Sequence, residues 1–340
     1  MSQRRVTIVE IAKEAGVSAQ TVSRVVNGHT NVAPETRDKI QEIIDRRGYH
    51  PSRLARSLLR GRSHTIGVVG YGLGLFGPSQ TLAGIIREAN EAGYSILPSM
   101  AIEPDIEDPA KVIGELIEYH VDGIIWAVPE IGGNHDGIEP LMAEQDIPFV
   151  FITMDHRPHL PVVSVDNRLG GRLATQHLID RGRRRIGLIK GPVDWWEARE
   201  RVQGWYETMQ ANGLPVEETL IKQGDWSTAA GERCMRELLQ SQTAIDAVFI
   251  SNDSMALGAL KAAREFGLNV PDDLAIVGFD DIPEAAYFFP ALTTVQQDLT
   301  SLGCRAVAEL DRLINSEDEE PVLPDEPIWI NPRLIVRESA

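Results

Sequence analysis

The chain has 340 residues, of which 43% are hydrophobic and 24% are charged, a composition that excludes disordered and fibrous proteins and predicts two or three globular domains. No apolar run reaches the ~18 residues of a membrane helix, no signal peptide opens the chain, and two cysteines cannot form a disulfide framework. We therefore expect a cytoplasmic protein without a membrane segment, a metal or a cofactor. The net charge is −17, but residues 1–62 hold 12 Lys and Arg against six Asp and Glu, whereas the remainder holds 21 against 44. This division predicts a small basic unit that binds nucleic acid and an acidic body that does not.

The basic unit begins with two short helices. The segment Thr7-Ile8-Val9-Glu10 forms a capping box, in which the side chains of its first and last residues bond to each other's amide groups. The helix that follows ends at Gly16, and Ser18 then caps a second helix over residues 19–26. Two short helices joined by a turn that contains glycine predict a helix-turn-helix.

The second helix separates its residues by face. Val22, Val25 and Val26 have the spacing of a buried face, and they should pack against a third helix that runs from Pro34 to Gly48. The opposite face carries side chains able to bond base edges or phosphates in a major groove, namely Gln20, Ser23, Arg24 and Asn27. The alternative is a structural three-helix bundle with a polar surface.

Residues 51–62 form a separate segment with four arginines and no acidic residue. Ser52 can cap a helix of about two turns, which is too short to be stable alone. Such a helix can order on DNA, with arginines on phosphates and a leucine wedged into the minor groove. The alternative is a solvated linker.

From Thr65 onward short Val- and Ile-rich runs alternate with helical stretches, which predicts parallel sheets covered on both faces. About nine or ten strands are too many for one doubly wound sheet, so we expect two lobes with a ligand cleft at the carboxyl ends of their strands. The expected strands are 65–70, 94–98, 123–128, 148–152, 162–165, 185–190, 220–223, 246–250 and 274–278, and the clearest helices are 81–91, 169–180 and 253–266.

The segment Val17 to Asn27 resembles the recognition segment of the lactose-repressor/purine-repressor (LacI/GalR) family of regulators, and Arg53 to Leu58 resembles that family's hinge helix. Body motifs in the family's order extend the resemblance over nearly the whole chain. They include Arg-Val-Gln-Gly-Trp at 201–205, Gly-Asp-Trp at 224–226, Ser-Asn-Asp-Ser-Met-Ala at 251–256, Val-Gly-Phe-Asp-Asp at 277–281 and Leu-Thr-Thr-Val-Gln-Gln-Asp at 292–298. Ala33 departs from the usual serine before the third helix and removes a side-chain cap.

The resemblance implies a repressor that binds a pseudo-palindromic operator as a homodimer, because a tetramerisation helix known in the family has no counterpart before Ala340. It assigns Gln20 and Arg24 to base contacts and Leu58 to the operator centre. The full set of expected DNA-binding residues is Thr7, Ser18, Gln20, Thr21, Ser23, Arg24, Asn27, Arg53, Ala55 and Leu58.

The resemblance also implies a domain plan, with a helix-turn-helix headpiece over 1–50, a hinge helix over 51–62 and a two-lobed body over 63–340 that resembles periplasmic sugar-binding proteins. The N-lobe would comprise residues 63–163 and 292–323, and the C-lobe residues 164–291 and 324–340. The three crossovers between the lobes would fall near 161–166, 289–294 and 321–326.

The effector expected between the lobes is a small saccharide. Planar polar groups suit pairs of hydroxyls, and flat aromatic rings suit the apolar face of a sugar ring. The residues expected to bind it are Tyr71, Phe76, Ser79, Trp195, Trp196, Glu197, Arg201, Trp226, Asn252, Asp280 and Gln297, the last of these placed in the third crossover. The unusual Asp194-Trp195-Trp196-Glu197 loop favours a glucoside or galactoside, and a disaccharide is one possibility; one of the two tryptophans is expected to fill the core instead.

Compared with the lactose-type pattern of the family, Tyr71 stands in place of a serine, Ala127 of an asparagine and Thr153 of an aspartate. Fewer polar groups on the N-lobe argue against lactose-type specificity. A non-sugar effector remains an alternative, and so does corepression in place of induction.

Two other classes of protein agree with parts of the sequence only. Residues 72–77 match G-x-G-x-x-G, but Pro78 and Ser79 are expected to delay the helix and Glu103 lies too far along to be the usual acid, which argues against an NAD-dependent enzyme. His156 and His159 lack further metal ligands nearby. A transport-type sugar-binding protein would have no helix-turn-helix. We therefore expect no enzymatic activity.

Overall fold

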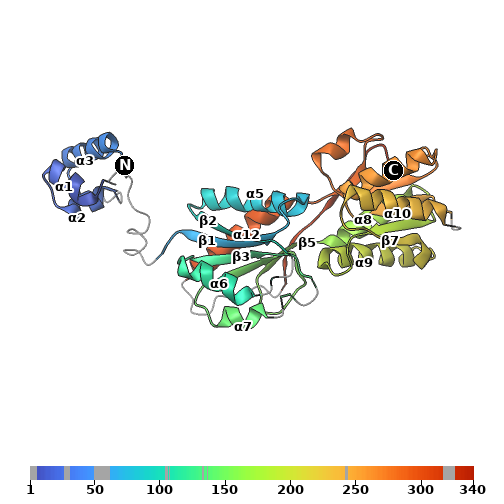
Figure 1. Ribbon diagram of the computed structural model, residues 1–340, viewed down its shortest axis with the longest axis horizontal. Helices are drawn as coiled ribbons and strands as arrows, with labels where there is room; N and C mark the ends of the chain where they lie inside the picture. The colour runs from blue at the N-terminus through green and yellow to red at the C-terminus, as the bar shows by residue number, and fades with distance from the viewer. Residues whose placement is uncertain are drawn as a thin grey trace. The chain divides into compact units, whose positions relative to one another are not determined.

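The computed structural model describes residues 6–26, 31–49, 62–103, 106, 108–131, 134–135, 137–241, 244–316 and 326–340. The chain divides into two compact units, Met1–His64 and Thr65–Ala340 (Figure 1). Most of the predicted hinge segment, with Arg53, Ala55 and Leu58, lies outside the described residues, and so does Asn27.

The first unit is the predicted three-helix arrangement. Its helices are α1 (Ile8–Ala15), α2 (Ala19–Val26) and α3 (Pro34–Arg47). Both halves of the capping box form, since Thr7 Oγ1 accepts from the amide of Glu10 and Glu10 Oε2 accepts from the amide of Thr7. Ala33 provides no side-chain cap to α3, as expected. Ile11, Val22 and Ile40, one from each helix, are fully buried and form the centre of its core.

The N-lobe of the second unit is built on a six-stranded parallel sheet in the order β11-β5-β4-β3-β1-β2. Its strands are β1 (Thr65–Tyr71), β2 (Ser95–Ala101), β3 (Gly123–Ala127), β4 (Phe149–Ile152), β5 (Val162–Val165) and β11 (Ile328–Ile330). The strands match the predicted Val- and Ile-rich runs, except β11, which is only three residues long.

The C-lobe repeats this plan in the order β12-β10-β9-β8-β6-β7. Its strands are β6 (Ile186–Lys190), β7 (Ile221–Gln223), β8 (Ala247–Ile250), β9 (Ala275–Asp280), β10 (Thr293–Gln296) and β12 (Arg333–Ile335). All neighbours are parallel except β10 and β12. The described residues therefore contain twelve strands in two sheets, more than the nine or ten expected, and β10, β11 and β12 are the three outside the predicted ranges.

Helices cover both faces of each sheet (Figure 1). In the N-lobe α5 and α12 share one apolar cluster, and α6 and α7 share another; in the C-lobe the pairs are α8 with α9 and α10 with α11. The helices are α5 (Phe76–Glu91), α6 (Pro109–Glu118), α7 (Ile138–Ala143), α8 (Asn167–Asp180), α9 (Trp196–Ala211), α10 (Thr228–Gln240), α11 (Asp253–Glu265) and α12 (Leu299–Ile314), with 3-10 turns η1 (Glu218–Leu220) and η2 (Pro283–Tyr287).

Two of the predicted crossovers are displaced. The first falls as expected, since β5 belongs to the N-lobe sheet and α8 packs on the C-lobe sheet. The second was expected at 289–294, but β10 stays in the C-lobe sheet to Gln296, so the chain crosses between 296 and 299. The third was expected at 321–326 but lies between 330 and 333, after β11 has joined the N-lobe sheet. The predicted lobe limits at 292, 323 and 324 are therefore wrong, because the places where β10, β11 and β12 pair depend on tertiary contacts that leave little pattern in the sequence.

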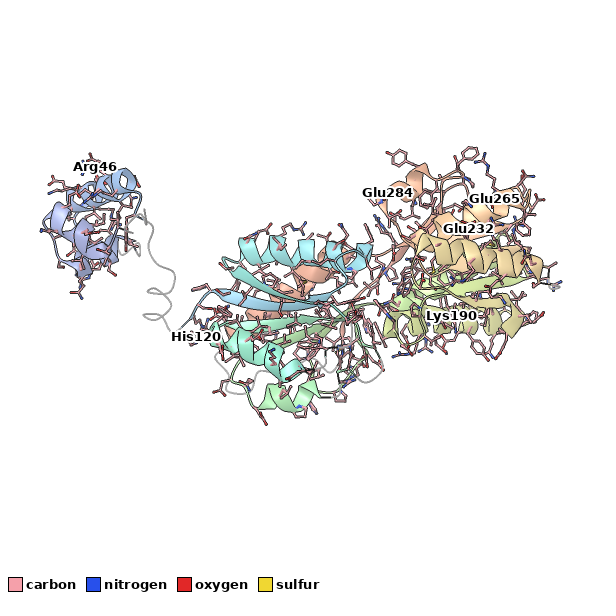
Figure 2. The ribbon with its side chains drawn as sticks, in the orientation of Figure 1. Arg46, His120, Lys190, Glu232, Glu265 and Glu284 are labelled. Carbon is pink, nitrogen blue, oxygen red and sulfur yellow. The ribbon has the colours of Figure 1, made fainter. Side chains whose placement is uncertain are left out.

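On the C-lobe surface an ion network joins α10 to α11. Arg236 and Lys261 each contact both Glu232 and Glu265, and the two glutamates are labelled side by side in Figure 2. Such exposed pairs contribute little individually. Within the described residues, no helix combines the length and the apolar character needed to cross a membrane.

Candidate functional site

The helix-turn-helix face carries exposed polar side chains held by a local cap. Ser18 Oγ accepts from the amide of Thr21 at 3.1 Å and lies 2.9 Å from its hydroxyl, which fixes the start of α2. Gln20 and Arg24 are exposed one turn apart, whereas Val22 is buried against the other helices. The predicted division of α2 into a buried and a polar face is therefore present.

Two other basic residues of this unit are already paired. Arg46 and Arg47, at the end of α3, both contact Glu14 of α1, at 2.6 and 2.9 Å. Arg24 has no such acidic partner in the described residues. Thr7 is exposed at the start of α1, but its hydroxyl and amide are both used in the capping box.

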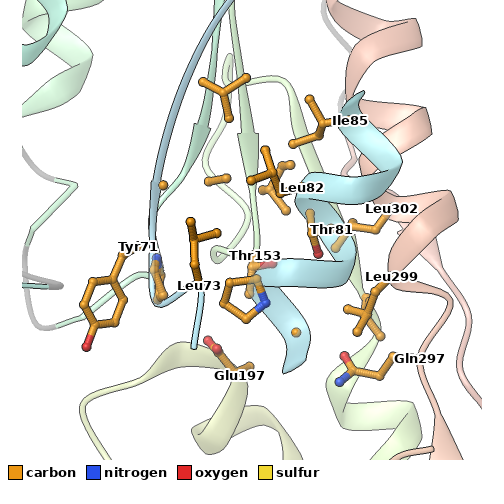
Figure 3. A pocket seen from close by; sticks show the side chains of 18 of the residues that line it. Tyr71, Leu73, Thr81, Leu82, Ile85, Thr153, Glu197, Gln297, Leu299 and Leu302 are labelled. Carbon is orange, nitrogen blue, oxygen red and sulfur yellow. The ribbon is translucent and has the colours of Figure 1, made fainter. Parts of the chain in front are cut away.

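The body contains a pocket with two adjoining compartments. The first, called here the apolar compartment, encloses about 720 Å³ including its mouth and lies mainly in the N-lobe (Figure 3). Its wall includes Val68, Leu73, Leu82, Ile85, Met100, Ile152, Leu299 and Leu302, with Tyr71, Ala127 and Thr153. The three N-lobe positions that depart from the lactose-type pattern all line this compartment.

The second compartment, called here the aromatic compartment, encloses about 560 Å³ on the same measure. It is lined by Gly74, Leu75, Phe76, Trp195, Trp226, Asn252, Ser254 and Asp280. Five residues line both compartments: Gly77, Pro78, Glu197, Arg201 and Gln297. The two compartments therefore meet at a junction that contains a glutamate, an arginine and a glutamine.

Arg201, on α9, is buried and held on several sides. Its Nε donates to Asn167 Oδ1 at 2.8 Å and its Nη1 donates to the carbonyl of Ser251 at 2.5 Å. The guanidinium lies 3.9 Å from the centre of the Phe279 ring and Nη1 lies 3.8 Å from Asp280 Oδ1. Burial lowers the pKa of this arginine, while Asp280 opposes that shift. The planar group is thus fixed in place before any ligand arrives.

Asp280 ends β9 with an unusual backbone. It has a φ of 113° and Asp281 one of 56°, both in the region that residues other than glycine rarely adopt. Asp281 holds this turn by accepting from Gln296 and Arg337, each at 2.6 Å. Gln297 donates to Asp280 Oδ1 at 2.7 Å, and burial raises the pKa of Asp280 to about 6.

Three aromatic rings connect the lobes in series. Tyr71, at the end of β1, meets Trp195 edge-on with ring centres 6.2 Å apart, and Trp195 meets Trp226 at 5.8 Å. The carbonyl of Trp226 accepts from Asn252, whose Oδ1 caps α11 by accepting from the amide of Met255. Asn252 is therefore committed to structure, while Trp226 Nε1 has no partner.

Glu197 lies in the first turn of α9 at the junction of the two compartments (Figure 3). Its Oε2 atom is buried and has no hydrogen-bond partner. Burial raises the pKa of Glu197 to about 7, although Arg201 one turn along the helix favours the charged form. A buried polar atom without a partner among the described residues is uncommon, which marks Glu197 as a candidate contact for a ligand.

Backbone strain also gathers around the pocket. Of the described residues other than glycine, seven have positive φ, and Thr153, Trp226 and Asp280 among them line one compartment or the other. Strained conformations persist where the surrounding structure holds them and often mark functional sites.

The structure brings nine of the eleven predicted effector residues to the pocket and leaves out Ser79 and Trp196. Ser79 Oγ donates to the carbonyl of Phe76, within its own helix. Trp196 is buried outside both compartments, and its amide donates to the carbonyl of Glu130. Trp196 is thus the tryptophan that fills the interior, and Trp195 is the one that lines the pocket. Gln297 lies in the second crossover and not in the third.

Sequence reasoning missed several residues that shape the pocket. Asn167 and the carbonyl of Ser251 hold Arg201, and nothing in their sequence context indicates that role. Leu299 and Leu302 could have been found, because their spacing continues the buried face of α12.

The segment after β1 differs in one respect from the structure predicted for it. The helix after β1 begins at Phe76, inside the G-x-G-x-x-G match, and is not delayed to residue 81. Pro78 is tolerated because the first turn of a helix needs no amide donor there. A different observation disfavours a dinucleotide site. Leu73 lines one compartment and Leu75 the other with an apolar side chain, whereas a pyrophosphate would require backbone amides there.

Comparison with known proteins agrees with both units. Residues 7–52 match the family described as bacterial regulatory proteins, lacI family, and residues 175–340 match the periplasmic binding protein-like domain. The lactose operon repressor of Escherichia coli (strain K12) is 33% identical over 93% of this chain and 86% of its own length. The HTH-type transcriptional regulator CelR of Thermobifida fusca is 35% identical over 99% of both chains.

Two solved structures extend the similarity to the fold. A lac repressor dimer bound to operator and the anti-inducer ONPF superimposes with a TM-score of 0.89 at 31% identity, over 99% of each chain. A CelR–cellobiose complex gives a TM-score of 0.72 at 32% identity, over 99% of this chain and 100% of that one.

A helix-turn-helix unit joined to a two-lobed periplasmic-binding-protein-like body defines the class of DNA-binding transcriptional regulators. The chain belongs to the LacI family of bacterial regulatory proteins.

Proposed function

We propose that this regulator is a cytoplasmic repressor whose affinity for a pseudo-palindromic operator is controlled by a small neutral saccharide bound between the lobes. The observation that carries the proposal is the aromatic compartment, where Trp195 and Trp226 stand beside Arg201 and Asp280. Aromatic rings suit the apolar face of a pyranose, and a fixed guanidinium and a carboxylate suit its hydroxyls.

The donor and acceptor inventory supports a polyol. Trp226 Nε1 is a donor without a partner and Glu197 Oε2 an acceptor without one, and both belong to residues that line the aromatic compartment. A hydroxyl both donates and accepts, so a ring that carries several hydroxyls can satisfy both atoms. An apolar ligand would leave both atoms unpaired, which costs about 1–3 kcal/mol each.

A disaccharide is favoured over a single ring. One relative of this chain was solved as a CelR–cellobiose complex, and the two compartments here give room beyond one pyranose. Trp195 and Trp226, both expected from the sequence to bind the effector, would provide the stacking surface.

For DNA, we propose that a homodimer places two α2 helices in successive major grooves. Ser18, Thr21 and Ser23 would bond the backbone, and Gln20 and Arg24 would read base edges. The segment with Arg53, Ala55 and Leu58 is proposed to complete the contact in the minor groove. Saccharide binding would oppose operator binding with a coupling of about 1–3 kcal/mol per site.

The test is fluorescence anisotropy of a labelled palindrome with a central C-G step, titrated with the full chain at fixed ~0.15 M salt. Binding that cellobiose or another neutral sugar releases would support the whole proposal. Binding that sugars strengthen would keep the saccharide and make it a corepressor. Binding that no sugar in a mono- and disaccharide panel changes would overturn the effector class.

Arg24 provides the matching test of DNA recognition. Because its guanidinium is exposed on the polar face of α2, Arg24→Ala should weaken operator binding by about 1–3 kcal/mol and binding to random DNA much less. Arg46→Ala is the control, since that arginine pairs with Glu14. Equal losses on operator and random DNA would reduce Arg24 to a phosphate contact.

A further inference from the structure

We propose that Glu197 is the specificity-determining residue of the pocket, which admits uncharged saccharides and rejects those that carry a phosphate or carboxylate. This rests on the proposed saccharide function and narrows it to one chemical class. The geometry behind it is the position of Glu197 at the junction, where it lines both compartments. A ligand that spans the two compartments must pass this carboxyl group.

The charged side chains that line the pocket disfavour the binding of an anion. Among the described residues that line the two compartments, Glu197 and Asp280 are the acids and Arg201 is the only cation. Arg201 is already engaged by Asn167, the Ser251 carbonyl and Asp280. A bound phosphate would therefore meet two carboxyl groups and one arginine whose charge is largely compensated, and like charges at close range are costly to bring together.

The place where an anion would otherwise bind is also taken. The first turn of a helix attracts negative charge, because its amides are unpaired and its dipole is positive there. In α9 that turn carries Glu197 itself, directly after the first helical residue. The side chain thus supplies the negative charge that a phosphorylated ligand would bring.

A purely structural role does not account for this carboxyl group. An acid that only stabilises the start of a helix normally lies at the surface in water, whereas Oε2 of Glu197 is buried without a partner. Glu200, three residues along the same helix, is also half-buried but lines neither compartment. Comparing variants of Glu197 and Glu200 therefore distinguishes a role in the pocket from a role in the helix.

The experiment is isothermal titration of the full-length protein with matched neutral and anionic sugars. The probes are cellobiitol against cellobionate, which share an open chain at the reducing end and differ in charge, and glucose against glucose 6-phosphate. We expect the wild type to prefer the neutral member by ~100-fold or more, since one unfavourable charge contact is worth several kcal/mol. Glu197→Gln, of nearly equal size, should reduce that preference to ~10-fold or less, whereas Glu200→Gln should leave it unchanged. Glu197→Asp keeps the charge and should keep most of the preference.

The outcomes separate the two proposals. Wild-type protein that binds cellobionate or glucose 6-phosphate as well as the neutral sugar would overturn the role of Glu197 and leave a saccharide effector. The same holds if Glu197→Gln discriminates as strongly as the wild type. If no sugar of either kind binds the wild type while operator binding is intact, the saccharide function itself fails and the selectivity falls with it. Operator affinity of each variant without sugar serves as the check on folding.

Discussion

The two lobes of the body share one topology but present opposite chemistry to the pocket. Each has a six-stranded sheet in the same order, with helices on both faces. The N-lobe strands end in Tyr71, Ala127 and Thr153, beside an apolar wall, whereas the C-lobe contributes Arg201 and Asp280. The fold therefore decides where a ligand can lie, and the few residues at the strand ends decide what kind of ligand it is.

The two lobes also differ in how firmly their pocket side chains are held. The C-lobe side chains are held by bonds on several sides, as Arg201 is by Asn167 and Ser251 and Asp280 by Gln297. The apolar N-lobe wall offers surface without directional bonds. We therefore expect changes on the C-lobe side to reduce ligand affinity steeply and changes on the N-lobe side to reduce it gradually.

The largest effect should follow from Arg201→Ala. The change removes the only cation among the described residues that line the pocket and leaves Asp280 and Glu197 without compensation, so sugar affinity should fall ~100-fold or more while operator binding persists. The loss of the buried group should also lower the free energy of unfolding by about 3 kcal/mol. Titration of cellobiose with Arg233→Ala as control, an exposed arginine on α10, measures the difference. A normal sugar response in Arg201→Ala would place the site elsewhere.

A smaller loss is expected from Trp226→Ala. The ring borders the aromatic compartment and carries an unpaired donor, so its removal should weaken cellobiose binding ~10- to 100-fold. Trp196→Phe is the control, because Trp196 is buried outside the pocket and should change thermal stability without changing sugar affinity. Equal losses of affinity in the two variants would show that the assignment of stacking to Trp226 is wrong.

The affinity for the sugar should change ~10-fold with pH. Burial raises the pKa of Glu197 to about 7 and that of Asp280 to about 6, with Arg201 and Arg199 opposing the shift at Glu197. If the ionised carboxylate accepts the sugar hydroxyl, affinity should rise ~10-fold from pH 6 to pH 8, as the competent fraction grows. Glu197→Gln should flatten that rise.

The stability of the protein without ligand should change in the opposite direction. Both pKa values are raised above those of the unfolded chain, so the folded state holds these protons more tightly. Their contribution to stability is complete below about pH 4 and is lost as the pH rises through 6 to 7. A thermal melt of the wild type against Glu197→Gln at pH 5 and pH 8 checks the sign, and the variant should gain relative stability only at the higher pH.

The smallest effect should come from the N-lobe wall. Leu73 lines the apolar compartment but is 48% exposed, so Leu73→Ala should reduce affinity for a disaccharide only ~2- to 5-fold and leave stability nearly unchanged. A loss as large as that of Trp226→Ala would show that the N-lobe holds the ligand as firmly as the C-lobe. The contrast between the lobes would then be wrong.

Local sequence signals predict most of the helices and strands. The capping box at Thr7, the stop at Gly48 and the apolar runs of the long central strands all act over a few residues, and the structure contains each of them. The short strands β11 and β12 carry no such signal, because a three-residue strand is stabilised by the neighbour it pairs with. This is why the third crossover was misplaced. The second was misplaced because β10 (Thr293–Gln296) stays in the C-lobe sheet, where it pairs with β9.

The candidate site, too, was predictable from the sequence only in part. The residue types of the pocket were evident in the sequence, since tryptophan, arginine and acids at strand ends suit a polar ligand. Neighbouring positions could not be told apart, however: Trp195 lines the pocket and Trp196 is buried, because α9 begins between them and turns successive side chains in different directions.

By itself the sequence determined the basic headpiece, the acidic body and the order of its main elements, because these depend on composition, periodicity and local caps. Its motifs also carry the resemblance to the family. Only the tertiary structure decided where the chain crosses between lobes, which partners hold Arg201, and that Glu197 lies at a junction with a buried oxygen unpaired. Those features depend on contacts between segments far apart in the chain. Packing fixes such contacts, and no local pattern records them.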